Sequence, residues 1–438
     1  MQSSPGPASQ TIPTLEACGI APDASLQGLQ VGPEHHSLIF SFFSGSGFLD
    51  LGFEREGFLP VLVNEYHAPF LAAYQHSRQR MHPPTPAPKL GYLQGSIEVF
   101  QAPRARAWLK RQIAAARSLG KPVGFIGGPP CPDFSNAGKH RGKDGDHGRL
   151  TQVYVDLIIT HRPDFFVFEN VKGLMRNHAE HLQEIEEQLA AAGYRFATRL
   201  ANALEYGVAQ DRERVVIVGF HKSLYQRAGL RVPRLRRLDA SLWQAEIGQK
   251  AAEIKKLPWP TTEPFLEGSS RSCPAGLPAN LTVDHWFRQN EVEQHPNARQ
   301  RFQPRQGLTR MQQVPEGDVS RKSFKRLHRW RYAATAAYGN NEVHLHPSES
   351  RRLSVAEALA IQSMPGDFEL PADMSLSNMF KTVGNGVPFL MSRGIACTVK
   401  RQLVALAPQQ AQDTPAPGED LAFSPQAGQV DAPQWVPT

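Results

Sequence analysis

The sequence predicts an α/β fold with a doubly wound, mainly parallel sheet and a second, smaller irregular domain. Residues 37–220 alternate short apolar runs with longer amphipathic stretches. This alternation is typical of strands joined by crossover helices. Residues 223–345 break the rhythm, because prolines, basic residues and scattered aromatic side chains are frequent there. Regular structure is predicted again after that segment.

The individual elements follow from the apolar runs and from the amphipathic stretches between them. Buried strands are predicted at residues 37–43, 59–66, 123–128, 164–171 and 214–220. Helices are predicted between them at residues 103–119, 151–161 and 180–192. The segment RRLSVAEALAIQ at 351–362 predicts a further helix, and a final helix is expected after Pro388.

Composition divides the chain into four parts. Residues 1–36 and 407–438 are rich in Pro, Ser, Gln and Ala and predict flexible tails. Residues 37–222 together with 377–406 are expected to form a discontinuous catalytic domain, and residues 223–376 the smaller domain. The hydrophobic content of 40% and charged content of 20% are typical of soluble globular proteins.

The sequence also argues against several protein classes. No apolar run approaches the roughly 18–20 residues that span a bilayer, and the N-terminus lacks the pattern of a secretory signal. The four cysteines are scattered and never form CxxC, so neither a disulfide framework nor a metal site is predicted. We therefore expect a cytoplasmic protein with no membrane association and no metal.

Positive charge is concentrated in one segment. The chain has a net charge of +7 and a pI near 9.2. Between Lys222 and His346 there are 21 Lys and Arg residues against 11 Asp and Glu residues. Such a segment indicates a module that binds a polyanion, or else an ordinary solvated surface; charge alone leaves both open.

A glycine turn follows the first predicted strand. Ser44–Gly47 reads SGSG and precedes a helix beginning near Phe48. Glycines at such a turn let a ligand approach the backbone at the carboxyl edge of the sheet, although a purely structural turn is an alternative. Glu65 ends the next strand, where an acid typically hydrogen-bonds ribose hydroxyls. A nicotinamide enzyme usually has GxGxxG, whereas Asp50 occupies the third glycine position here. An adenosine-containing ligand is therefore expected.

A rigid loop carries the most informative cysteine. GGPPCPDFS at residues 127–135 follows a predicted strand and contains Cys131. A single cysteine is more often an inert buried residue. Here two glycines and three prolines stiffen a loop at a strand's carboxyl end, where open α/β sheets bind their ligands. This setting favours Cys131 as a catalytic nucleophile.

Two further motifs carry ionisable groups near strand ends. FENV places Glu169 at the end of a predicted strand. There it could be a helix cap or a surface residue. If it is buried beside Cys131, its pKa would rise and it could hold or donate a proton. QDRER at 210–214 precedes the last strand; its paired arginines, Arg212 and Arg214, suit a polar substrate or a solvated strand start. GNGVP at 384–388 is a turn leading into the final helix.

Taken in order, these motifs resemble the cytosine-5 DNA methyltransferase family. The set is FFSGSGFLDLGFE, NEY, GGPPCPDFS, FENV, QDRER, RRLSVAEALAIQSMP and GNGVP, with a basic insert between the fifth and sixth. The resemblance covers about residues 37–221 and 320–400. It implies a Rossmann-like, S-adenosylmethionine-dependent methyltransferase fold, with residues 223–376 as the target-recognition domain. It also implies S-adenosylmethionine as cofactor, S-adenosylhomocysteine as product, and no metal.

The resemblance also implies roles for individual residues. Cys131 matches the nucleophile, Glu169 the cytosine-binding acid, and Arg212 and Arg214 the substrate-orienting arginines. The implied S-adenosylmethionine site consists of Phe43, Ser44, Gly45, Ser46, Gly47, Glu65, Ser96, Ile97, Pro130, Leu150, Asn385 and Val387. Of these, Glu65 is expected on the ribose. Arg351 and Glu357 match residues that brace the recognition domain.

Three departures from the family pattern stand out. Phe48 occupies a position where a second glycine is common, and Ser96 one where an aspartate usually contacts adenine. The nucleophile loop has Pro132 and Asp133 in place of the commoner residues after PC. None of these departures removes a catalytic group.

The expected function is DNA (cytosine-5) methylation of a specific duplex sequence. A covalent bond between Cys131 and carbon 6 of a flipped cytosine is expected, as is a role in protecting host DNA within a restriction-modification or antiphage system. The expected partners are duplex DNA and a cognate restriction or defence system, with the enzyme monomeric, cytoplasmic and nucleoid-associated when bound. Alternatives are a tRNA cytosine-5 methyltransferase, a catalytically silent DNA-binding protein and, on the glycine turn alone, a nicotinamide oxidoreductase.

Overall fold

The computed structural model describes residues 13–130, 146–304, 307–321, 323–335, 338 and 344–407. The predicted nucleophile Cys131, together with Pro132 and Asp133, lies outside the described residues. The backbone leading to it is described up to Pro130.

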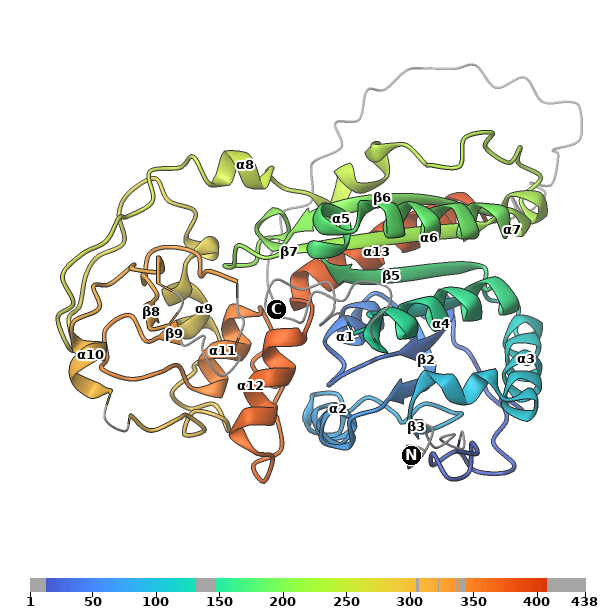
Figure 1. Ribbon diagram of the computed structural model, residues 1–438, viewed down its shortest axis with the longest axis horizontal. Helices are drawn as coiled ribbons and strands as arrows, with labels where there is room; N and C mark the ends of the chain where they lie inside the picture. Colours follow the sequence, from blue (N-terminus) through green and yellow to red (C-terminus); the bar gives the residue numbers. More distant parts are fainter. Residues whose placement is uncertain are drawn as a thin grey trace, which may run out of the picture. The chain divides into compact units, whose positions relative to one another are not determined.

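A seven-stranded sheet forms the centre of the fold (Figure 1), in the order β3-β2-β1-β4-β5-β7-β6. Its strands are β1 (Ser37–Phe42), β2 (Phe58–Glu65), β3 (Tyr92–Gln94), β4 (Val123–Gly127), β5 (Phe165–Val171), β6 (Tyr194–Asn202) and β7 (Glu213–His221). The first five strands pair in parallel. Only β7 runs antiparallel to its neighbours β5 and β6. The predicted doubly wound, mainly parallel sheet is therefore confirmed.

The strand order reverses between β1 and β4. From β1 the chain continues outward to β2 and β3, whereas from β4 it continues to β5 on the other side. In open α/β sheets this reversal opens a crevice at the carboxyl ends of the two central strands. Phe42, the last residue of β1, lies opposite Gly127, the last residue of β4. The glycine turn and the loop toward Cys131 therefore leave the sheet side by side.

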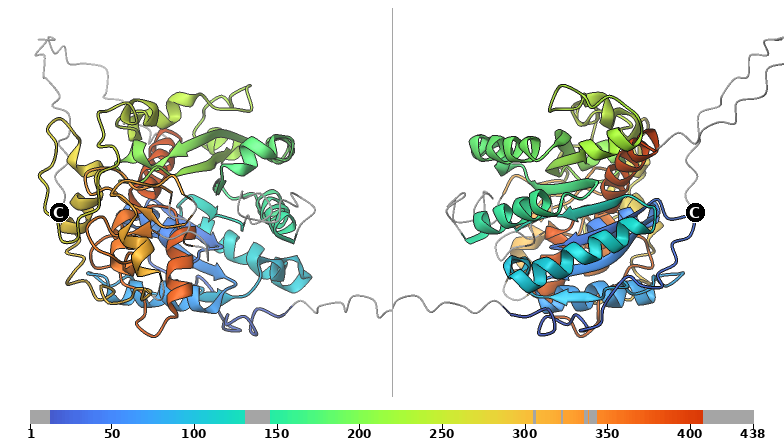
Figure 2. Two further views of the ribbon diagram at one scale, coloured as in Figure 1. Left: turned by 60° about the vertical axis from the view of Figure 1, so that its left-hand side comes forward. Right: turned by 90° about the vertical axis from the view of Figure 1, so that its right-hand side faces the viewer.

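Helices cover both faces of the sheet, because side chains alternate along each strand. Leu38, Phe40 and Phe42 pack on the face of α3 (Pro103–Ser118), α4 (Asp146–His161) and α6 (Ala179–Ala191). Ile39 and Ile126 pack on the opposite face with α1 (Phe48–Arg55) and α13 (Phe389–Ala405). Figure 2 (right) shows the sheet between α4 and α6 on one side and α13 on the other.

The C-terminal helix α13 is fixed against the N-terminal helix α1. Gly52 permits the close approach, because a Cβ atom there would lie 2.2 Å from Ser392 Oγ. Ser392 donates to the carbonyl oxygen of Leu49, and Arg393 forms a 2.7 Å ion pair with Glu56. The GNGVP turn immediately precedes α13. These contacts therefore place it near α1.

The N-terminal segment 13–36 packs on the sheet domain although it contains no helix or strand. Leu15, Cys18, Ile20 and Leu26 are buried in the same core as β1 and α3. The carbonyl oxygen of Cys18 accepts a 2.8 Å hydrogen bond from the amide of Gln94 at the end of β3. Because this segment lacks hydrophobic periodicity, its sequence predicts only a tail.

Between β7 and α13 the polypeptide forms short helices and strands that are joined by irregular segments (Figure 1). They are α7 (Lys222–Arg227), η4 (Ala240–Glu246), α8 (Ala251–Ile254), η5 (Ala279–Leu281), α9 (Val283–Gln289), α10 (Leu308–Gln312), β8 (Lys325–Arg326), β9 (His344–Leu345), α11 (Val355–Ile361) and α12 (Leu376–Asn385). Val355 of α11 shares a core with Phe48 of α1 and Phe380 of α12. The predicted domain limits at 222 and 376 stay predictions. Among the described residues, every helix is too short or too polar to cross a bilayer.

Candidate active site

The turn from β1 into α1 adopts left-handed backbone conformations at three positions. The φ angles are 54° at Phe43, 57° at Gly45 and 79° at Gly47, and the amide of Gly47 donates to Ser44 O at 2.9 Å. A Cβ atom at Gly45 would contact nothing within 4 Å, whereas one at Gly47 would lie 2.6 Å from the Tyr74 ring. Gly47 is therefore required sterically, and Gly45 leaves open space beside the backbone.

Glu65 lies directly beside this turn. Its Oε2 accepts a 2.8 Å hydrogen bond from the amide of Gly45, and its Oε1 accepts a 2.7 Å bond from the amide of His67. Glu65 is 8% exposed, and burial raises the pKa of its carboxyl group. The structure thus brings together the two sequence features from which an adenosine ligand is predicted.

Ser96 and Ile97 follow β3 at the same edge of the sheet. The amide of Gly95 donates to the carbonyl oxygen of Glu65 at 3.0 Å. The Ser96 hydroxyl accepts a 3.3 Å bond from the amide of Glu98 and donates to Glu98 Oε2 at 2.9 Å, which caps helix η1 (Ile97–Gln101). Ile97 is buried in the core. Ser96 is therefore next to Glu65, but its hydroxyl is engaged locally.

The end of α12 reaches the glycine turn. The hydroxyl groups of Ser46 and Thr382 are 2.7 Å apart and buried. Asn385, the last residue of α12, is exposed, whereas Val387 is buried against α13 and the sheet. Two chain segments that are more than 300 residues apart therefore meet at the predicted cofactor site.

Phe48 fits at its unusual position because Gly386 has no side chain. A Cβ atom on Gly386 would lie 2.6 Å from the Phe48 ring. Phe48 is buried, and its ring centre lies 5.3 Å from that of Phe368. The aromatic ring thus fills space between α1 and the GNGVP turn, and the departure from the common glycine pattern is accommodated by packing.

Pro130 and Leu150 lie on the far side of the turn. Pro130 is half-buried just after β4, and Leu150 is half-buried on α4 against the main core. Phe43 approaches the same helix, because its ring centre lies 6.0 Å from that of Tyr154. The predicted cofactor residues therefore come from β1, β2, β3, β4, α4 and α12, all near the carboxyl edge of the sheet.

Glu169 ends up beside the backbone that leads to Cys131. A Cβ atom on Gly128 would lie 2.7 Å from Glu169 Oε2. The other carboxylate oxygen forms a 3.0 Å ion pair with Arg214 Nε on the adjacent strand β7. Glu169 is 8% exposed; burial raises its pKa, and the charges of Arg214 and Arg212 oppose this rise.

Arg212 connects β7 to the GNGVP turn. It is fully buried, and its Nη2 donates to Gly384 O at 2.7 Å and to Gly386 O at 2.9 Å. The neighbouring Gln210 donates to Gln362 at 3.4 Å, and Gln362 in turn donates to Val383 O at 2.6 Å. The QDRER motif thus positions the start of α13, while a direct role of Arg212 toward the thiolate stays a prediction.

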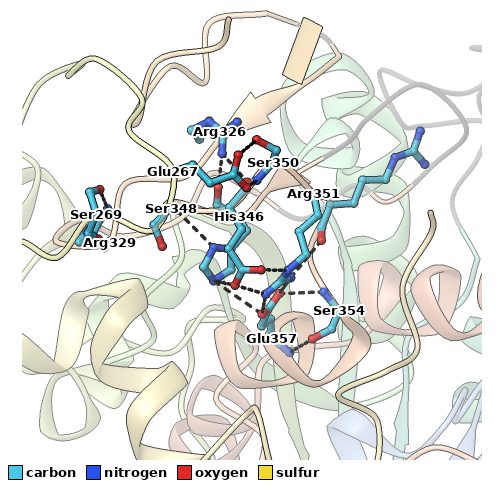
Figure 3. Close-up of polar contacts among 12 residues, drawn as sticks. Glu267, Ser269, Arg326, Arg329, His346, Ser348, Ser350, Arg351, Ser354 and Glu357 are labelled. Atoms are coloured by element: carbon cyan, nitrogen blue, oxygen red, sulfur yellow. Dashed lines mark hydrogen bonds and ion pairs between the residues drawn. The ribbon is translucent and has the colours of Figure 1, made fainter. Parts of the chain in front are cut away.

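Arg351 and Glu357 form the centre of a polar network (Figure 3). Arg351 Nη2 is 2.7 Å from Glu357 Oε1, and Arg351 Nη1 donates to Glu357 Oε2 at 2.9 Å. Arg351 Nε also pairs with Glu349 at 2.6 Å, and the amide of Ser354 donates to Glu357 at 2.7 Å. These contacts tie α11 to the segment that precedes it, while the role of Arg351 and Glu357 in bracing the recognition domain stays a prediction.

Sequence reasoning assigned no role to two residues within these motifs. Tyr66, next to Glu65, is 73% exposed. Within the described chain, the buried Asn170 Nδ2 has no hydrogen-bond partner, and the same holds for the hydroxyl of Ser44, which was predicted at the cofactor site. Tyr66 and Asn170 belong to recognised motifs, but residue type alone does not indicate which side chains remain available to a ligand.

Comparison with known proteins identifies the family. Residues 98–401 match the C-5 cytosine-specific DNA methylase family. The chain belongs to this family. It is 55% identical to the Type II methyltransferase M.NmeDI of Neisseria meningitidis serogroup C over 84% of each chain. It is 29% identical to the Type II methyltransferase M.FnuDI of Fusobacterium nucleatum over 83% of this chain and 94% of that protein.

Two solved structures share the fold. A prophage-encoded E. coli protein described as a DNA modification methyltransferase superimposes with a TM-score of 0.54 at 19% identity, over 84% of this chain and 99% of that one. The methyltransferase EhMeth of Entamoeba histolytica gives 0.52 at 12% identity, with the same coverage. The family match confirms the predicted enzyme class, DNA (cytosine-5) methyltransferase, and it implies methyl transfer from S-adenosylmethionine. The site residues stay predictions.

Asp50 is a buried carboxyl group beneath the glycine turn. It is fully buried on the first turn of α1, and Tyr74 donates to its Oδ2 at 3.2 Å. Burial, and then the nearby charge of Glu54, raise the pKa of Asp50 to about 7. Because this value exceeds the unfolded one, the contribution of Asp50 to stability is full below about pH 4 and is lost as pH rises toward 7.

We predict that Asp50→Asn removes this loss. Between pH 5 and pH 8 the wild type should lose about 3 kcal/mol of unfolding free energy through Asp50. The variant should not show this loss, so its unfolding free energy relative to the wild type should be about 3 kcal/mol higher at pH 8 than at pH 5. Urea unfolding at both pH values measures the change. Asp156→Asn, at an exposed position on α4, controls for loss of a carboxylate. Identical pH dependence of Asp50→Asn and wild type would show that Asp50 is ionised normally.

Proposed function

We propose that this enzyme is a Type II modification methyltransferase that methylates carbon 5 of one cytosine within a specific duplex sequence. It acts as a monomer through a covalent bond between Cys131 and carbon 6 of a flipped base, and it protects host DNA beside a restriction nuclease or another antiphage system. One observation carries the proposal. The backbone leading to Cys131 leaves the sheet between the glycine turn held by Glu65 and the buried carboxylate of Glu169.

The residues at the glycine turn fit S-adenosylmethionine. Gly45 faces open space, and the Ser44 hydroxyl is buried without a partner in the described chain. Two amides already fix the Glu65 carboxylate, whose remaining lone pairs suit the two hydroxyls of a ribose. The exposed ring of Tyr66 suits stacking on the adenine base. Ser96, Ile97, Pro130, Leu150, Asn385 and Val387 complete the proposed lining.

The chemistry explains why these groups are needed. S-adenosylmethionine supplies an electrophilic methyl group, but carbon 5 of cytosine is too weak a nucleophile to accept it unaided. When the Cys131 thiolate bonds to carbon 6, the electron pair of the 5,6 double bond moves into the ring and makes carbon 5 nucleophilic. After methylation, loss of the carbon-5 proton restores the double bond and expels the thiolate, so that the enzyme is regenerated.

The buried charges support this sequence of steps. Glu169, whose pKa is raised by burial, holds a proton toward N3 of cytosine and stabilises the added electron density. Arg214 orients Glu169 through their 3.0 Å ion pair. A free thiol of pKa near 8.5 is only a few per cent ionised at pH 7. We assign Arg212 to favouring the thiolate of Cys131.

DNA engagement follows from the direction of attack. The thiolate approaches perpendicular to the ring, a path that stacking blocks in a duplex, so the target base must be flipped out. The basic segment from Lys222 to His346 supplies phosphate contacts that offset this cost and make binding depend on salt. Side chains within about residues 225–315 are proposed to distinguish the target sequence.

Replacing the nucleophile separates chemistry from cofactor binding. Cys131→Ser should abolish methyl transfer to duplex DNA, because an alcohol is not ionised at neutral pH, while S-adenosylmethionine affinity should change little. Labelled-methyl incorporation and calorimetry measure the two properties. Cys397→Ala, at a half-buried position on α13, is the control and should retain turnover. Full turnover by Cys131→Ser would refute covalent catalysis.

Glu65→Gln tests the ribose assignment. The substitution preserves size but removes the charge from two hydrogen-bonded oxygens, so the Kd for S-adenosylmethionine should rise about tenfold or more. Calorimetry on DNA-free enzyme measures it. The exposed Glu187→Gln on α6 serves as the matched control. An unaltered Kd for Glu65→Gln would mean that the cofactor binds elsewhere.

A further inference from the structure

Arg78, a buried arginine with no role in the proposed chemistry, contacts the glycine turn from below. It lies on α2 (Ala68–Arg80) and is 1% exposed. Its Nη2 donates to the carbonyl oxygen of Gly47 at 2.7 Å. Its Nε and Nη2 contact Glu54 at 2.8 and 3.0 Å, and its Nη1 donates to Ser77 at 3.3 Å. All three nitrogens of the guanidinium group are therefore engaged.

The same strand–helix unit, β2 followed by α2, holds both ends of the turn. Glu65, at the end of β2, accepts from the amide of Gly45, and Arg78, near the end of α2, donates to the carbonyl of Gly47. The amide of His67, just before α2, donates to Glu65 and joins the two holding points. The backbone from Gly45 to Gly47 is thus fixed between an acceptor and a donor that belong to one rigid unit.

The guanidinium group also occupies the space beside Gly47. A Cβ atom on Gly47 would lie 2.7 Å from Arg78 Nη2 and 2.6 Å from the Tyr74 ring. Tyr74 supports the arrangement from the side, because its ring centre is 4.4 Å from Arg78 Cζ and its hydroxyl donates to Glu54 at 2.9 Å. Tyr74 and Arg78 therefore pack against Gly47 where a side chain would lie, and Arg78 also holds its carbonyl oxygen.

Stability alone does not explain a buried ion pair at this place. Removing two charges from water costs several kcal/mol per ion, and well-packed apolar side chains of similar size are often as stable. Stability is therefore weak grounds for the pair between Arg78 and Glu54, and its hydrogen bonds are the more informative feature. What an apolar side chain could not do is donate to the carbonyl of Gly47.

We propose that Arg78 is a positioning residue for S-adenosylmethionine, with Glu54 as its counter-ion. It holds the turn from Gly45 to Gly47 in the conformation that presents its backbone to the cofactor. The inference rests on the cofactor site proposed above. It concerns cofactor affinity only, because the hydrogen bonds of Arg78 go to Glu54, Ser77 and Gly47 and not to the residues proposed to bind cytosine.

Arg78→Met tests the inference, since methionine fills much of the space but donates no hydrogen bond. The Kd and the KM for S-adenosylmethionine should both rise about tenfold, the effect of losing one charge-assisted hydrogen bond. The kcat and the KM for DNA should stay within about twofold of wild type. Calorimetry on DNA-free enzyme gives the Kd, and labelled-methyl kinetics give the other values. Arg78→Lys retains a single charged donor group in place of the guanidinium fork and should fall between wild type and Arg78→Met.

A matched control separates positioning from general damage. Arg329 is also buried and pairs with Glu316 at 2.8 Å, but it lies in the segment between β7 and α13. Arg329→Met should destabilise the protein without altering S-adenosylmethionine affinity. If Arg78→Met fails to fold, Glu54→Gln removes the counter-charge with little change of shape and should weaken cofactor binding in the same direction.

Each result has a distinct meaning. Wild-type affinity in folded Arg78→Met would overturn the inference, and so would an equal loss in kcat and in both KM values. Failure of the wild-type enzyme to bind S-adenosylmethionine would instead overturn the proposed function. A selective rise in the cofactor Kd, absent in Arg329→Met and partly recovered in Arg78→Lys, would support the positioning role.

Discussion

The adjacency of β1 and β4 is the constraint on which the site depends. Their last residues, Phe42 and Gly127, are partners in the parallel ladder, and the strand order reverses between them. Two loops therefore leave the sheet at the same level and in neighbouring positions. One is the glycine turn, and the other leads to Cys131. Neither loop alone could bring together the two motifs; the pairing of the two strands does so.

Two buried carboxylates flank this point, and their different partners suit different tasks. Glu65 is held by the backbone amides of Gly45 and His67, which fix its position without adding a full charge. This arrangement suits hydrogen bonds to neutral hydroxyl groups. Glu169 is held by the guanidinium of Arg214 and lies against the backbone at Gly128. Burial raises the pKa of both acids, but only Glu169 lies against the backbone that leads from β4 toward Cys131.

The strand positions could be predicted because buried strands give continuous apolar runs. The predicted strand at 214–220 corresponds to β7. Its antiparallel direction could not be predicted, because the residues of a strand buried on both faces do not indicate which way the strand runs. The strand β6 was not predicted, because YRFATRLAN mixes polar and apolar side chains at a sheet edge. Chain direction and edge strands depend on tertiary pairing.

Sequence-based prediction of the candidate site is limited for the same reason. Motif order predicted which residues gather at the carboxyl edge, and the contact between Gly45 and Glu65 agrees with it. Non-local packing could not be predicted: the Phe48 ring fits against Gly386, and Arg78 reaches the carbonyl of Gly47. Local capping was also missed, because the hydroxyl of Ser96 bonds to Glu98. Each of these depends on where side chains point after folding.

The central claim, attack by the Cys131 sulfur on carbon 6, is tested most directly by trapping the bond. Duplex DNA containing 5-fluorocytosine cannot lose fluorine in place of the carbon-5 proton, so elimination of the thiolate is blocked after methylation. With S-adenosylmethionine, the enzyme should form a DNA complex that survives denaturation, and mass spectrometry should locate the nucleotide on the peptide containing Cys131. Efficient methylation of ordinary DNA without any such complex on the fluorinated duplex would contradict the account.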